Sequence, residues 1–61
     1  MNKLKQARKD RKKTLQYVAD ALGVSRQRYF QIEQNPDRAR IEQAKTIGKA
    51  LGKDPSTIFF D

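Results

Sequence analysis

The segment from Arg26 to Gln31, which reads RQRYFQ, contains the side chains of this chain that are best suited to specific recognition. An arginine can donate two parallel hydrogen bonds to guanine O6 and N7, and a glutamine can pair in the same two-pronged way with adenine N6 and N7. Each such contact discriminates between bases by about 1–3 kcal/mol. These residue types indicate recognition of base edges, provided that a helix holds them in a row.

Other chemistries find little support in the sequence. The chain has 61 residues and contains neither cysteine nor histidine, so we expect no disulfide, no thiolate chemistry and no metal site of the usual zinc type. No paired carboxylates, no nucleophile with an adjacent base and no phosphate-binding glycine loop stand out. We therefore expect a single domain over residues 1–61 with one small core, no cofactor and no enzymatic activity.

The charge of the chain favours an anionic partner. Fourteen Lys and Arg residues against seven Asp and Glu residues give a formal net charge of +7, and residues 1–13 alone carry seven basic side chains and one acidic. A solvated basic helix that only aids solubility is the alternative interpretation. No apolar run approaches the roughly 20 residues that span a bilayer, so we expect a cytoplasmic protein with no membrane partner.

The spacing of apolar residues predicts an all-α fold of five short helices. Asn2, Thr14, Ser25 and Asp54 are suited to cap helices that begin directly after them. The predicted ranges are 3 to about 12, 15–22, 26 to about 34, 41–51, and a short helix from 55. In the fourth helix we expect one shared buried face, formed by Ile41, Ala44, Ile47, Gly48 and Leu51. Its start is poorly marked, and Asp37 is a candidate cap for an irregular turn before it.

The second and third predicted helices are separated only by Gly23-Val24-Ser25. A glycine that ends one helix and a serine that caps the next give a tight, nearly perpendicular pair, in which Ala19 is small where the helices cross. This is a helix-turn-helix, whose second helix can enter the major groove of DNA. Residues near the start of that helix reach deepest, which favours Arg26 and Gln27, and Gln31 follows one turn later.

At these residues the sequence resembles the lambda-repressor-like helix-turn-helix family, also called the XRE family, which includes phage repressors and Cro proteins. The likeness covers essentially the whole chain and rests on Leu4, Arg8, Thr14, Val18, Ala19, Leu22-Gly23-Val24-Ser25, Ile32-Glu33, Ala50-Leu51-Gly52 and Ile58-Phe59. It implies a five-helix fold in a phage or bacterial DNA-binding regulator. Many such proteins are repressors that bind partly palindromic operators as dimers.

The resemblance also implies roles for individual residues. Ser25 and Arg28 correspond to mixed phosphate and base contacts, and Arg38 and Arg40 to loop residues that contact the sugar-phosphate backbone. Phe30 has two open interpretations, contact with a thymine methyl group or packing on its own helix. The five lysines of the first thirteen residues are expected to add only a diffuse attractive field; they are Lys3, Lys5, Lys9, Lys12 and Lys13.

The sequence departs from the family pattern at several places. The family usually has a phosphate-binding glutamine directly after the threonine, whereas here Leu15 follows Thr14, which leaves Gln16 as the candidate backbone contact. We expect Leu15 to fold inward and replace apolar surface that Lys13 does not supply. The usual glycine after the recognition helix is Asn35, and the usual loop proline is Ala39.

Two further expectations concern helix orientation and assembly. The resemblance implies that Arg8 pairs with Glu33, which would fix the angle at which the third helix is presented. At the end of the chain, Ile58 and Phe59 are expected to face the core, so that Phe60 is a candidate contact of a weak homodimer formed or strengthened on DNA. Packing of Phe60 beside Leu51 is the alternative.

Three classes of function remain open from the sequence. The first is a sequence-specific transcriptional regulator, a small repressor or Cro-like protein that binds double-stranded DNA with its third helix. The second is a DNA-binding accessory protein of the excisionase-like or architectural kind. The third is a protein-binding module that uses the same fold on an acidic partner.

Overall fold

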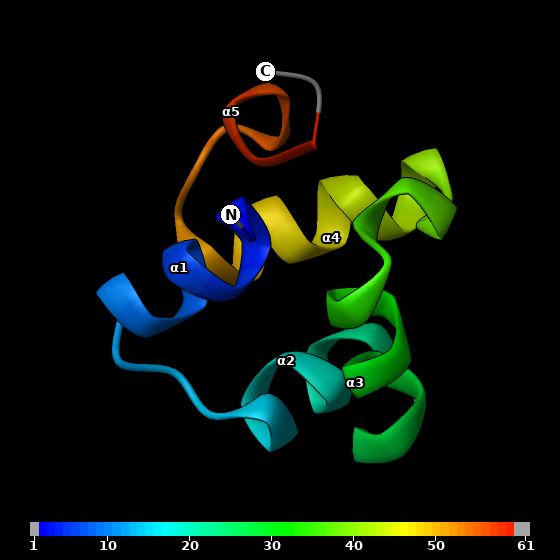
Figure 1. Cartoon of the computed structure of the whole chain (residues 1–61). Helices are drawn as coiled ribbons and strands as arrows, with labels where there is room; N and C mark the ends of the chain where they lie inside the picture. The colour runs from blue at the N-terminus through cyan, green and yellow to red at the C-terminus, as the bar shows by residue number, and fades with distance from the viewer. Residues whose placement is uncertain (1, 60–61) are drawn as a thin grey trace.

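The structure is a computed structural model that describes residues 2–59. In this range the chain forms five α-helices and one short 3-10 helix, without any strand (Figure 1). The elements are α1 (Lys3–Asp10), α2 (Leu15–Leu22), α3 (Arg26–Gln34), η1 (Pro36–Arg38), α4 (Ile41–Leu51) and α5 (Pro55–Phe59). The predicted all-α fold with five helices is therefore confirmed. The candidate dimer contact Phe60 lies outside the described residues.

The predicted caps hold the first three helices at their expected starts. The side chains of Asn2, Thr14 and Ser25 accept hydrogen bonds from the backbone N–H groups of Lys5, Tyr17 and Arg28, at 2.9, 3.0 and 3.1 Å. Each bond satisfies an N–H group that has no partner within its own helix. Short polar side chains at three positions thus set where α1, α2 and α3 begin.

The first helix is shorter than predicted. It ends at Asp10 rather than near residue 12, because Lys12 adopts a left-handed conformation with a φ of 56°. Lysine is rarely found in this conformation, so the sequence carried no signal for it. The Lys13 N–H group donates to the Arg8 carbonyl and closes the turn that leads to α2.

The segment between α3 and α4 also differs from the prediction. Asp37 lies inside η1, so it does not precede this 3-10 helix as a cap would; Asn35 does, and among the described residues no side chain caps η1. The start of α4 is stabilised instead by a residue of the helix itself. The Gln43 side chain accepts a hydrogen bond from the Arg40 N–H group at 3.0 Å. This reversed cap explains why the residue before α4 needs no capping side chain.

The core lies where all five α-helices meet. It contains buried apolar residues from each of them, namely Leu4, Ala7, Val18, Ala19, Tyr29, Ile32, Ile47, Leu51 and Ile58. Leu15, Leu22, Val24, Ala39 and Phe59 are partly buried and pack against this cluster. The inward positions predicted for Leu15, Ile58 and Phe59 are confirmed.

One predicted core position is wrong. Ile41 is 68% exposed, although Ala44, Ile47 and Leu51 on the same face of α4 are buried. The reason is its place at the first residue of the helix, where α4 extends beyond the elements that cover its later turns. Helical spacing identifies a face correctly but does not show how far along the helix its neighbours reach.

The helices form two groups joined by α4. Figure 1 shows α2 and α3 together at the bottom of the molecule, α5 at the top, and α4 running between them. Contacts link α4 to both α2 and α5, while α5 also contacts α1. Within residues 2–59, every helix is too short or too polar to span a bilayer.

Candidate nucleic-acid interface

The connection between α2 and α3 has the geometry that its sequence predicts. Gly23 adopts the left-handed conformation, with a φ of 73°, and ends α2. The Val24 N–H group then donates to the Ala19 carbonyl at 3.0 Å, and Ser25 caps α3 immediately afterwards. Because the turn is so short, α3 is held directly across α2 at the completely buried Ala19.

Burial divides the faces of α3. Tyr29, Ile32 and Glu33 are buried, which fixes the inward side of the helix. With 3.6 residues per turn, Gln27 and Gln31 lie opposite this side, in the middle of the solvent-facing surface. Arg26 and Arg28 lie on the two flanks of this row, and all four polar side chains are exposed. The predicted row of hydrogen-bonding side chains is therefore present on one outward surface.

The first flank of α3 forms a pocket with the start of α2. Arg26 lines it together with Arg8, Thr14, Leu15 and Gln16. The Gln16 amide nitrogen donates to the Asp20 carboxylate at 2.7 Å, one turn along the same helix. The structure thus brings Gln16 and Arg26 together, while Leu15 is partly buried, as expected for its inward position.

The second flank forms a more enclosed and strongly cationic pocket. It has a volume of about 420 Å³ and is lined by Arg28, Gln31, Ile32, Asn35, Arg38 and Arg40. Three of these residues are arginines, and no acidic residue lines the pocket within the described chain. Arg28 donates to the Gln31 side chain at 3.3 Å, which directs its guanidinium along the helix. A guanidinium cluster of this kind is suited to a phosphate group.

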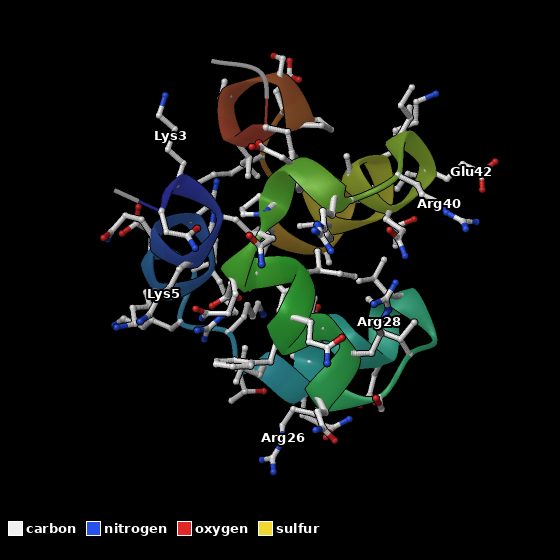
Figure 2. The ribbon with its side chains drawn as sticks, turned by 45° about the vertical axis from the view of Figure 1, so that its right-hand side comes forward. Lys3, Lys5, Arg26, Arg28, Arg40 and Glu42 are labelled. Atoms are coloured by element: carbon white, nitrogen blue, oxygen red, sulfur yellow. The ribbon has the colours of Figure 1, made fainter. Side chains whose placement is uncertain are left out.

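Figure 2 shows the labelled arginines around this surface. Arg26 extends away from the molecule at the N-terminal end of α3, whereas Arg28 and Arg40 lie on the same side of the molecule although they belong to different segments. Lys3 and Lys5 lie on α1, well apart from these arginines. The labelled basic residues therefore fall into one group around α3 and another on α1.

Sequence reasoning missed one member of the second pocket. Asn35 was noted only as the residue that ends α3, yet it lines the arginine pocket together with Arg38 and Arg40. A polar amide placed directly between the helix and a basic loop was the available signal. Phe30 is 46% exposed on α3, so its ring is available to a ligand and is not packed into the core.

The angle of α3 is held from the buried side by Glu33. Its carboxylate accepts two hydrogen bonds from Arg8, from Nε to Oε2 at 2.9 Å and from Nη2 to Oε1 at 3.0 Å. Arg8 also donates to the Lys13 carbonyl at 2.9 Å, and the Asn2 side chain donates to the Glu33 carbonyl. The hydrogen bond to Glu33 raises the pKa of Arg8. The ion pair expected between the two residues is thus present.

Tyr29 completes this buried group. Its side chain is fully buried, and within the described residues its hydroxyl has no hydrogen-bond partner. Burial raises the pKa of Tyr29, and the Glu33 carboxylate raises it further because a second negative charge beside it is unfavourable. Beneath the outward row of α3 there is consequently one charged pair and one neutral phenol.

Comparison with known proteins agrees with this geometry. A family model described as helix-turn-helix matches residues 4–58, which is nearly the whole chain. No significant match was found among curated proteins or among solved structures.

Proposed function

Because the chain belongs to the XRE family of DNA-binding helix-turn-helix regulators, we propose that it is a sequence-specific transcriptional regulator of the small repressor or Cro type. In this proposal α3 enters the major groove and reads base edges. The observation that carries it is the outward row formed by Gln27 and Gln31, flanked by Arg26 on one side and the arginine pocket on the other. Such a surface offers base-reading groups beside a cationic pocket that can anchor the DNA backbone.

Individual residues have distinct roles in this function. Arg26, Gln27 and Gln31 contact base edges, and Phe30 contacts a thymine methyl group beside them. Arg38 and Arg40 bind a backbone phosphate within the arginine pocket, whereas Arg28, which lines the same pocket, contacts both phosphate and base. Ser25 and Gln16 contact the backbone at the opposite flank. Phosphate contacts of this kind set the register of α3 in the groove.

The partner is double-stranded DNA with a partly palindromic site, bound inside the cell. Two copies bind as a weak homodimer that forms or strengthens on DNA, with Phe60 as a candidate contact. A two-fold pair would present its recognition helices about 34 Å apart, which corresponds to half-sites one helical turn apart.

Selection of bound duplexes from a random pool, followed by sequencing, tests this function. The expected result is a short motif repeated with inverted symmetry and a spacing of about one helical turn. A motif without symmetry would support sequence-specific binding but contradict the proposed homodimer. Binding without any motif, combined with strong bending of the duplex, would instead support an architectural factor.

A further inference from the structure

A concave surface lies between α4 and the start of α5, and its described lining includes no residue of α3. Here the buried Gly48 leaves room for the Pro55 ring, since a Cβ atom at Gly48 would lie 2.7 Å from Pro55 Cγ. These two residues form part of an open groove of about 480 Å³, which Lys45, Lys49 and Lys53 also line. We call it the lysine groove.

The charge of this groove is unusual for its part of the chain. Its three lysines, spaced four residues apart, are the only basic residues between positions 41 and 61. Lys53 lies 3.6 Å from the Asp10 carboxylate, but within the described residues neither Lys45 nor Lys49 forms an ion pair. Three ammonium groups therefore line a groove with an apolar floor, and among the described residues only the charge of Lys53 has a carboxylate close to it.

Helix electrostatics account for only part of this arrangement. Lys49 and Lys53 lie near the C-terminal end of α4, where the helix dipole favours positive charge. Lys45 lies nearly two turns before that end, where the effect of the dipole has fallen off. The lysine that extends the groove along α4 thus has no such structural explanation.

We infer that the lysine groove binds an acidic segment of a partner protein. An apolar side chain of that segment would cover Gly48 and Pro55, while its carboxylates would pair with Lys45 and Lys49 at the rim. An apolar centre with a charged rim is the usual composition of a protein interface, and opposite charges across it favour association. Charge complementarity therefore identifies the occupant.

A second copy of this chain fits the groove poorly. Most of its described carboxylates already accept hydrogen bonds within the molecule, as Asp10 does from Gln6, Asp20 from Gln16, and Glu33 from Arg8. Asp54 likewise accepts a hydrogen bond from the Ser56 N–H group. Two copies meeting at this face would place lysines against lysines, which is unfavourable.

The position of the groove separates it from the proposed DNA-binding surface. Figure 1 shows α5 at the top of the molecule and α3 toward the bottom, and the described lining of the groove includes no residue of α3. A duplex bound along α3 would leave the lysine groove accessible. The inference thus extends beyond DNA binding, because the protein could hold DNA and an acidic partner at the same time.

The test uses the ¹⁵N-labelled full chain and a short fluorescent peptide of alternating aspartate and leucine. We expect peptide-induced changes in amide chemical shift to concentrate at Thr46, Gly48, Lys49 and Gly52. The double variant K45E/K49E should bind the peptide about tenfold more weakly or worse, because two surface attractions become repulsions. A peptide with serine in place of leucine should also bind more weakly, since it cannot cover the apolar floor.

The matched control is K5E/K9E, which reverses two exposed lysines with the same spacing on α1. It should keep most of the peptide affinity, whereas equal losses in the two variants would reduce the effect to net charge and overturn the inference. Shift changes centred on α3, or no peptide binding at all, would overturn it as well. So would a lower molecular mass by sedimentation in K45E/K49E alone, because the groove would then be an interface between two copies of this chain. Circular dichroism establishes that both variants remain helical.

Discussion

The Arg8 guanidinium and the Glu33 carboxylate form a two-pronged ion pair that joins α1 to the last turn of α3. Glu33 is only 1% exposed, so this pair is one of the few charged contacts inside the protein. A third hydrogen bond, from Arg8 to the Lys13 carbonyl, ties the pair to the turn before α2. One arginine therefore connects α1, the turn before α2 and the last turn of α3.

Arg8→Ala should destabilise the protein much more than Lys9→Ala. Removing one partner of a buried pair leaves an uncompensated charge and costs about 3–5 kcal/mol, whereas Lys9 is exposed and its loss should change stability by less than about 0.5 kcal/mol. Urea denaturation provides the measurement. Because Arg8→Ala could exceed the total stability of so small a domain, Arg8→Lys serves as the milder variant. Equal urea midpoints for Arg8→Lys and Lys9→Ala would contradict a structural role for the pair.

Stability should fall in alkaline solution because of Tyr29. Its pKa is raised above the ordinary value of 10.0, so the folded state keeps a proton that the unfolded state releases above that pH. The stabilisation is complete below pH 10 and is lost as the pH rises toward the higher pKa, by up to about 1.4 kcal/mol per pH unit. Tyr29→Phe should remove this decrease. It should change stability at neutral pH by no more than about 1 kcal/mol, because the buried hydroxyl has no hydrogen-bond partner among residues 2–59.

The control for this prediction is Tyr17→Phe. The Tyr17 ring is about half exposed, with the Lys13 ammonium 4.4 Å from its centre. Denaturation curves at several alkaline pH values should have the wild-type pH dependence in Tyr17→Phe and a weaker one in Tyr29→Phe. The same alkaline slope in both variants would assign the effect to other groups.

Gly48→Ala should destabilise the protein, against the usual trend for helices. Alanine inside a helix is ordinarily about 1 kcal/mol better than glycine. Here the added Cβ would lie 2.7 Å from Pro55 Cγ and 2.8 Å from the Lys53 carbonyl oxygen, and such overpacking costs about 1–3 kcal/mol. Thermal denaturation measures the change. Partial recovery in Gly48→Ala/Pro55→Ala would support this cause, whereas a more stable Gly48→Ala variant would contradict it.

Local signals account for the parts of the fold that the sequence predicted. Caps at Asn2, Thr14 and Ser25 and the left-handed Gly23 act within a few residues, so their effects could be identified without knowledge of the tertiary structure. The early end of α1 could not be predicted, because Lys12 adopts a conformation that its residue type does not favour. The predicted burial of Ile41 was wrong for a different reason, because its exposure depends on how far the neighbouring helices extend.

The candidate site was also predictable only in part. The outward row of α3 followed from helical spacing once Tyr29 and Ile32 were assigned to the core. The arginine pocket did not follow, because it depends on how η1 folds back beside α3 and brings Arg38 near Arg28. Residue types indicated which side chains are candidates for DNA contact, whereas only the tertiary structure showed how they are grouped.

DNA binding should weaken steeply as salt concentration rises. If the two flanks of α3 and the surrounding basic residues neutralise about six phosphates, the logarithm of affinity against the logarithm of salt should have a slope near −5. Fluorescence titration of a labelled duplex at several salt concentrations measures it. A nearly flat response would contradict the proposed phosphate contacts. Arg38→Ala should reduce the slope by about one, because one phosphate contact is lost.

Substitutions in the outward row should change base preference, unlike substitutions in the arginine pocket. Arg26→Ala, Gln27→Ala and Gln31→Ala each remove a side chain placed to contact a base edge, so each should cost about 1–3 kcal/mol on the selected site and little on random DNA. Arg38→Ala should instead weaken binding to both duplexes by a similar factor, since phosphates carry no sequence information. Competition titrations with selected and random duplexes measure the ratio. If all four variants lost affinity equally on both duplexes, α3 would bind DNA through charge alone, and its outward glutamines would not read the sequence.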